Sequence, residues 1–261
     1  MAHRYAHGKR YREIISVFSK YGFETILEQV GVYKHIGLNK IKIRVGNETI
    51  SLQLSSGERL RMALEELGPT FIKVGQVLST RSDLLPADIV EELKNLQKSV
   101  QPFPFSQVKE MIEEEFQDSL DHIFMEFGQE PVAAASISQV HKAKFSSGKT
   151  VAVKVQRPNI RDTINVDLEI LRDIAKFIDQ HTKYGKIYHF TDMAAEFQKT
   201  LENELDFTKE AENAEIFRQN FLKDEKDLYK RQRIQRNRRF LLPKALFPFE
   251  APVFYVLRLW R

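Results

Sequence analysis

The sequence contains no cysteine among its 261 residues. Disulfide bonds, thiolate metal sites and cysteine nucleophiles are therefore excluded, and the composition suits a reducing compartment. The sequence has no run of 18 apolar residues, so it predicts no transmembrane helix. No apolar signal core follows the basic residues 1–11 either, so we expect a cytoplasmic chain rather than a secreted one.

The sequence also lacks a large excess of charge of one sign, because it has 40 basic and 36 acidic side chains and a net charge of +4. That excess is too small to indicate a nucleic-acid partner. The hydrophobic fraction of 42% and the charged fraction of 29% are typical of a folded, soluble chain. Its length allows one large domain or two small ones.

The first half of the chain has helical periodicity. Residues 11–30 predict one or two amphipathic helices interrupted at Gly22, whose apolar face either packs on the protein or contacts a membrane surface or partner. Further helices are predicted from Gly57 to the Gly68-Pro69 stop, over 70–80 and 88–98, and onward from Ser106 as an N-cap. Residues 31–57 predict only a linker or short strand.

The pattern changes after Pro131. Residues 139–145 and 150–155 read as two strands joined by a turn, and long helices are predicted near 160–180 and over about 191–221. A helical block followed by a hairpin and helices indicates the α+β class.

Lys154 lies within an apolar strand of sequence VAVKV, residues 151–155. Its alternation predicts that Val151, Val153 and Val155 enter a core and that Lys154 points the other way. An ammonium group there needs water, a carboxylate or a phosphate as its partner. An edge strand with a surface lysine is the alternative interpretation.

Three further segments could contribute to a nucleotide site. The alanine-rich stretch of residues 133–136 stands where kinases carry a glycine-rich phosphate loop, although it is also compatible with ordinary packing. If residues 191–221 form one helix, Asp206 and Glu210 share a face and Glu204 points elsewhere. The alternative interpretation is that all three carboxylates lie on a solvated acidic face. Lys73 and Gln76 would share a helical face beside Gly75.

Taken together, these segments resemble the AarF/UbiB/ADCK family of atypical kinases. The resemblance is carried by LGPTFIKVGQVLSTRSDLLP (67–86) with the KxGQ motif, EPVAAASISQVHKA (130–143), VAVKVQRP (151–158) and ELDFTKEAENAE (204–215) with the ExD motif. It covers roughly residues 10–221. It implies a protein-kinase-like small lobe, formed by a small sheet and an αC-type helix, behind a family-specific helical extension.

The resemblance also implies roles for the residues of these motifs. Lys154 would bind ATP phosphates with Glu210 as its carboxylate partner, and Mg²⁺ would accompany ATP in the intact family. The turn over the phosphates would be Ala133, Ala134, Ala135 and Ser136. Lys73 and Gln76 would engage Glu204 and Asp206, an arrangement thought to block protein substrates. The family implies ATP-dependent work in ubiquinone or prenyl-lipid metabolism on membranes.

Two kinase elements are missing from the sequence. No H-x-D followed by a suitable Asn occurs after residue 210, and the only Asp-Phe pair, Asp206-Phe207, lacks the glycine of a DFG motif. We therefore expect no catalytic or metal-binding residues, no large lobe, and a truncated, catalytically incompetent kinase. The alternative is a non-catalytic module that binds a nucleotide or a partner.

The expected organisation has four parts. Residues 1–57 form an amphipathic segment and linker, 58–130 a helical extension, 131–228 the small lobe, and 229–261 a divergent tail that reads as out of frame. Residues 229–240 hold six basic and no acidic side chains. Because no aromatic platform accompanies them, we interpret them as solvated rather than as a nucleic-acid site. Contact with a lipid or membrane surface stays open, which would make the chain peripheral.

Overall fold

The computed structural model describes residues 2–29, 54–97, 101–231, 244–245 and 254–258. The chain divides into two compact units. The helical unit comprises Met1–Val100 and Asn159–Thr200, and the sheet unit comprises Gln101–Pro158 and Leu201–Arg261. Each unit is formed by two separated stretches of the chain, which the sequence did not predict.

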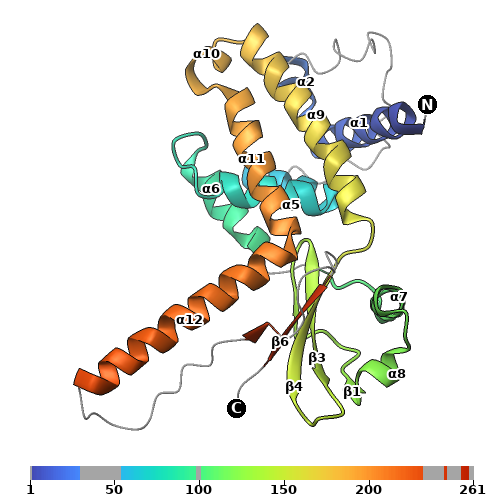
Figure 1. Cartoon of the computed structure of the whole chain (residues 1–261). Helices are drawn as coiled ribbons and strands as arrows, with labels where there is room; N and C mark the ends of the chain where they lie inside the picture. Colours follow the sequence, from blue (N-terminus) through green and yellow to red (C-terminus); the bar gives the residue numbers. More distant parts are fainter. Residues whose placement is uncertain (1, 30–53, 98–100, 232–243, 246–253, 259–261) are drawn as a thin grey trace. The chain divides into compact units, whose positions relative to one another are not determined.

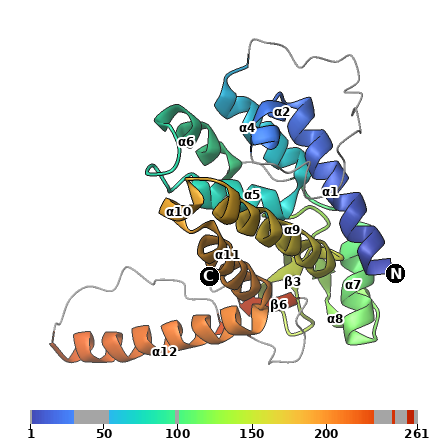
Figure 2. The same cartoon turned by 90° about the horizontal axis from the view of Figure 1, so that it is seen from above.

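The helical unit begins with α1 (Ala2–Lys20) and α2 (Glu24–Gln29), followed by α4 (Ser56–Leu67), α5 (Pro69–Leu78), α6 (Ala87–Leu93) and the 3₁₀ turn η1 (Lys94–Gln97). It continues with α9 (Ile160–His181), α10 (Gly185–Tyr188) and most of α11 (Phe190–Leu205). Figure 2 shows α1, α4, α5 and α9 packed together. The segment predicted as a helix over 88–98 is thus an α-helix that tightens into a 3₁₀ turn.

Local signals explain the ends of these helices. Gly22 has φ of 81° and separates α1 from α2, as predicted. Ser55 and Glu58 form a reciprocal capping box that starts α4. Gly68, with φ of 90°, ends α4, and Pro69 opens α5. The predicted boundary at Gly68-Pro69 is therefore confirmed.

The core of the helical unit contains one face of α1. The buried residues of this core, which come from several helices of the unit, are Tyr11, Ile14, Ile15, Val17, Tyr21, Ala63, Leu64, Leu67, Phe71, Ile72, Leu93, Leu96 and Ile170. Of the two interpretations of residues 11–30, packing against the protein is confirmed for this face. Burial of these side chains supplies the main stabilisation of the unit.

Within the described ranges, the sheet unit contains α7 (Phe105–Phe116), α8 (Leu120–Ile123), α12 (Phe207–Arg231) and six strands. The strands are β1 (Glu126–Phe127), β2 (Ala133–Ala134), β3 (Ser138–Lys144), β4 (Thr150–Gln156), β5 (Lys244–Ala245) and β6 (Phe254–Arg258). They pair antiparallel in the order β1-β3-β4-β6-β5, and β2 pairs with β3. Strands β1, β3, β4 and β6 are labelled in Figure 1. The α+β class and the hairpin formed by β3 and β4 are confirmed.

Three expectations about the sheet unit need correction. Ser106 is not an N-cap, because α7 begins at Phe105 directly after Pro104. The predicted single helix over 191–221 is two helices, α11 and α12, which meet at Asp206. Residues 254–258, to which the sequence assigned no structure, form β6 and pair with β4. That pairing joins segments about 100 residues apart, so no local signal could reveal it.

Candidate functional site

Lys154 lies in β4, an inner strand of the sheet. Its register neighbours are Val140 on β3 and Tyr255 on β6. Val151, Val153 and Val155 are fully buried in the core of the sheet unit, whereas the Lys154 side chain is 21% exposed. The predicted alternation is therefore confirmed, and the edge-strand alternative is wrong because β4 is paired on both sides.

Glu210 supplies the carboxylate opposite Lys154. The Lys154 Nζ donates to Oε1 of Glu210 at 2.8 Å and to Oε2 at 2.6 Å. The ammonium also lies 4.7 Å from the ring centroid of Phe207, which is fully buried. The Glu210 side chain is 42% exposed. The pair thus combines a constrained lysine with a carboxylate that still reaches solvent.

Asp206 explains how Glu210 comes to face β4. The Asp206 Oδ1 accepts hydrogen bonds from the backbone N–H groups of Thr208 at 3.1 Å and Lys209 at 3.3 Å. Asp206 is therefore the N-cap of α12, and Glu210 lies in the first turn of that helix. The expectation that Asp206 and Glu210 share one face of a continuous helix was wrong, because an aspartate side chain competes with the helix for backbone donors.

The end of β4 holds this capped junction in place. Gln156, which is buried, donates from Nε2 to the carbonyl oxygen of Leu205 at 2.9 Å. Leu205 is the last residue of α11. One strand therefore presents Lys154 and also anchors the junction that orients Glu210. Gln156 was missed because an isolated glutamine in a strand carries no distinctive signal.

The alanine-rich stretch is partly strand. Ala133 and Ala134 form β2 and pair with Val140 and Gln139 of β3. The turn is closed by a hydrogen bond from the Ala135 backbone N–H to the Ser138 carbonyl at 2.7 Å. Ala133 and Ala135 are exposed, whereas Ser136 is buried. These residues therefore form a tight hairpin turn rather than an open loop.

A buried polar chain lies beneath this hairpin. His141 contacts the Gly128 carbonyl through Nδ1 at 2.8 Å and the Gln139 amide nitrogen through Nε2 at 2.9 Å. Burial lowers the pKa of His141, so the ring stays neutral near pH 7. A neutral ring with Nδ1–H donating can accept from Gln139, which makes both contacts favourable. This histidine was not predicted as a site residue, because a single buried histidine has no distinctive spacing in the sequence.

Lys73 and Gln76 lie in α5 of the helical unit. The Gln76 side chain donates to the Leu96 carbonyl at 3.2 Å. A Cβ at Gly75 would lie 2.3 Å from Leu96 Cδ1 and 2.7 Å from Leu64 Cδ1. The two leucine side chains therefore leave no room for a side chain at this position. Engagement of Glu204 and Asp206 by Lys73 and Gln76 stays a prediction.

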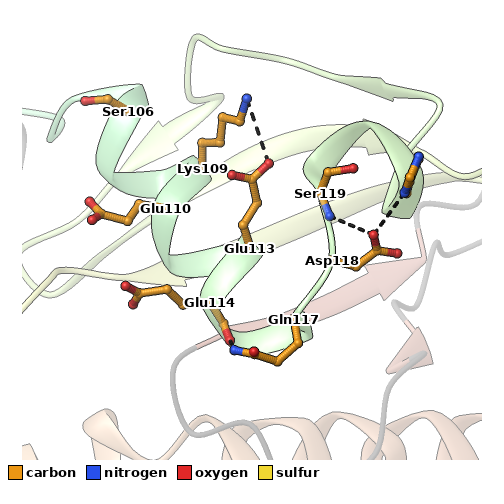
Figure 3. A pocket seen from close by; sticks show the side chains of 9 residues that line it. Ser106, Lys109, Glu110, Glu113, Glu114, Gln117, Asp118 and Ser119 are labelled. Carbon is orange, nitrogen blue, oxygen red and sulfur yellow. Dashed lines mark hydrogen bonds and ion pairs between the residues drawn. The ribbon is translucent and has the colours of Figure 1, made fainter.

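One open depression of about 900 Å³ lies between α7 and α8. Figure 3 shows the side chains that line it, among them Glu110, Glu113 and Glu114. Glu113 pairs with Lys109 at 3.8 Å and accepts from the Leu120 backbone N–H at 2.8 Å. None of the predicted site residues lines it. Of its carboxylates, Glu113 and Asp118 are engaged in local contacts.

Two features are absent from the described residues. Among them, no three histidine or acidic side chains gather in a group that could hold a metal ion. Within the same ranges, no helix is both long and apolar enough to cross a membrane.

The comparisons with known proteins are consistent with this arrangement. The ABC1 atypical kinase-like domain matches residues 95–230. A probable protein kinase UbiB from Marinobacter nauticus is 45% identical over 169 residues, which are 65% of this chain and 31% of that protein. The corresponding protein of Pseudomonas fluorescens is 44% identical over 170 residues, 65% of this chain and 32% of that protein. The chain thus spans about a third of these curated relatives.

A solved structure of the Rv3197–erythromycin complex from Mycobacterium tuberculosis is 28% identical. Its TM-score is 0.45, with coverage of 76% of this chain and 46% of that one. The domain match includes the Lys154 strand, the alanine-rich turn and the Asp206–Glu210 junction. On the strength of that match, the chain belongs to the AarF/UbiB family of atypical, protein-kinase-like proteins.

Proposed function

We propose that the sheet unit binds the phosphates of a nucleotide, ATP in the first instance, through Lys154. The observation that carries this proposal is the ion pair of Lys154 with Glu210, at 2.6 and 2.8 Å, on an inner strand of a kinase-like family member. In protein kinases a strand lysine paired with a helix glutamate reaches the phosphates. The carboxylate orients the ammonium, from which a phosphate oxygen of the bound nucleotide would accept a hydrogen bond.

The residues around the pair suit such a ligand. Ala152, two positions before Lys154 on the same strand, is small, which leaves room for a base as the corresponding kinase alanine does. The turn of Ala133, Ala134, Ala135 and Ser136 would cover the phosphates with backbone and methyl groups. Alanine restricts the backbone more than glycine does, so this cover would be stiffer than a glycine-rich loop.

Phosphoryl transfer is not part of the proposal for these 261 residues. They contain no catalytic-loop Asp with its Asn and no DFG motif, and their described part offers no Mg²⁺ ligand set. We therefore propose binding without turnover by this chain. Family membership supports a role in ubiquinone or related prenyl-lipid metabolism, and Lys73, Gln76, Glu204 and Asp206 would restrict access by protein substrates.

A comparison of ATP binding to the whole chain and to Lys154→Ala tests the proposal. Titration calorimetry should show the dissociation constant rising at least about tenfold, a loss of about 1.4 kcal/mol. Lys149→Ala is the matched control, because Lys149 is exposed in the turn between β3 and β4 and its removal changes the charge equally. Equal affinities for all three chains would refute the lysine's role. Mg²⁺-dependent ATP turnover that Lys154→Ala abolishes would refute binding without catalysis.

We further propose peripheral contact with a membrane, for which the turn around α10 offers a suitable surface. Tyr184 and Ile187 are 56% and 67% exposed beside Lys183 and Lys186, and residues 180–191 contain no carboxylate. Aromatic and aliphatic side chains flanked by lysines are typical of interfacial anchors.

Sedimentation of the chain with anionic phospholipid vesicles tests this contact. We expect Ile187→Glu to reduce the bound fraction severalfold, because a carboxylate would have to enter the apolar interface. Ile216→Glu is the control, since Ile216 is similarly exposed on α12. Equal binding of Ile187→Glu and the unaltered chain would exclude this surface.

A further inference from the structure

Arg157 directly follows β4, the strand that carries Lys154 and Gln156. Its Nε donates to the Ser136 carbonyl at 3.1 Å, and its Nη2 donates to the Gln101 carbonyl at 2.6 Å. The guanidinium also lies 5.4 Å from the ring centroid of Phe103. One side chain therefore links the alanine-rich turn to the segment of residues 101–103.

The backbone of Arg157 adds a further link to the same turn. Its N–H donates to the Ile137 carbonyl at 2.8 Å. The turn residues Ser136, Ile137 and Ser138 are all buried. Main-chain and side-chain bonds of Arg157 thus hold two consecutive carbonyls of the turn, which limits how far the turn can move away from β4.

Residues 101–103 are themselves held to the sheet. The Gln139 side chain accepts from the Phe103 backbone N–H at 3.0 Å and donates to the Phe103 carbonyl at 3.2 Å. Gln139 is buried, and its amide pairs with the Phe103 backbone much as a neighbouring strand would. Phe103 is therefore held to β3, and the Gln101 carbonyl that accepts from Arg157 lies two residues before it.

The charge of Arg157 is not matched by a carboxylate among its described contacts. Burial lowers its pKa, which is the sign of desolvation without a compensating anion. An arginine whose role was to form an ion pair would contact a carboxylate, and Arg157 contacts carbonyl oxygens instead. The geometry instead uses the planar fork of the guanidinium, because two donors in fixed directions reach two carbonyls at once.

We propose that Arg157 is a positioning residue that fixes the alanine-rich turn of residues 133–138 against residues 101–103, so that the turn is held ready to cover nucleotide phosphates. This inference rests on the proposed function for its purpose, and on the bonds of Arg157 for its mechanism. A lysine at this position would keep the charge but lacks the fork, so it cannot hold both carbonyls in the same geometry.

Hydrogen exchange on the chain without nucleotide tests the mechanism. We expect Arg157→Lys to raise the exchange rate of amides in residues 133–138 about tenfold, with β3 and β4 core amides unchanged, because only the turn is released. The Ala135 N–H, bonded to the Ser138 carbonyl, is the most informative amide. Lys142→Ala, which removes one charge from the same hairpin, should leave the turn unaffected.

Nucleotide titrations then test the purpose. Arg157→Lys should weaken ATP binding about tenfold while adenosine binding stays within about twofold, since only the phosphates meet the turn. A general loss of structure would weaken both ligands equally. If the turn amides of Arg157→Lys exchange at the same rate as those of the unaltered chain, the positioning role is overturned. If Arg157→Ala loses affinity for ATP and Arg157→Lys keeps it, Arg157 contacts the nucleotide directly through its charge instead.

A second variant covers the case in which Arg157→Lys unfolds the sheet. Phe103→Leu keeps an apolar side chain but removes the ring beside the guanidinium, so it should raise turn exchange in the same direction by a smaller factor. Unchanged exchange there would also overturn the role. If the unaltered chain binds no ATP, the proposed function fails, whereas the exchange result still decides whether Arg157 holds the turn.

Discussion

Each compact unit contains an ion pair that joins distant parts of the chain, and the two pairs differ in their surroundings. In the helical unit, Arg10 of α1 meets Asp167 of α9 through two bonds of 2.7 and 3.1 Å, with side-chain exposures of 15% and 0%. In the sheet unit, Lys154 meets Glu210 with exposures of 21% and 42%. The first pair is enclosed, and the second remains open on its carboxylate side.

The additional contacts of Arg10 indicate a structural role. Its Nη2 donates to the Leu67 carbonyl at 2.6 Å, and its guanidinium lies 5.7 Å from the Phe71 ring centroid. Although desolvation works in the opposite direction, the hydrogen bond with Asp167 raises the pKa of Arg10. An enclosed pair satisfied in this way holds helices together, whereas an accessible pair such as Lys154–Glu210 can exchange part of its interaction for a ligand.

Breaking the enclosed pair should have the largest effect on stability. We expect Asp167→Ala to lower the free energy of unfolding by about 3 kcal/mol, because it removes the buried carboxylate that pairs with Arg10 and leaves only the half-exposed Glu13, 3.1 Å from Nη1. Urea denaturation of the chain measures this loss. The double variant Arg10→Met with Asp167→Leu should recover most of it, since apolar residues of similar volume need no partner.

The exposed pair of Arg81 with Asp83 provides the control for that experiment. Asp83→Ala should leave the midpoint of urea unfolding nearly unchanged, because water screens an exposed ion pair. A loss below about 1 kcal/mol for Asp167→Ala would mean that the Arg10 pair is no more structural than this surface pair.

Breaking the open pair should have the smallest effect on stability. We expect Glu210→Gln to lower the free energy of unfolding by less than about 1 kcal/mol, because water screens a pair whose carboxylate is this exposed. The same urea titration measures it, beside an ATP titration in which affinity should fall. A stability loss above about 2 kcal/mol would assign Glu210 a structural role like that of Asp167.

Much of the local structure was visible in the residues themselves. The positive φ angles of Gly22 and Gly68 and the proline after Gly68 separate helices where the sequence places breakers. The valines of β4 and the turn before them predicted both the hairpin and the direction of Lys154. These signals act within a few residues, which is why they can be read without a fold.

Other features had weak or absent local signals. The preference of aspartate for N-caps was the available sign of the break at Asp206, but the apolar spacing on both sides suggested one helix instead. Residues 254–258 have the β-branched and aromatic side chains of a strand, yet their partner could not be named. Gln139, His141, Gln156 and Arg157 act through contacts that spacing does not encode.

By itself, then, the sequence determined the α+β class, most helix and strand positions, the outward direction of Lys154 and the family resemblance, because periodicity and turn chemistry are local. The family resemblance named Glu210 as the partner of Lys154, but only the tertiary structure decided that Glu210 arrives on a separate, capped helix and that β6 flanks the lysine strand. The tertiary structure also decided which carbonyls Arg157 holds. These outcomes depend on long-range packing, in which the chain orders distant groups only where burial and satisfied hydrogen bonds outweigh the entropy lost.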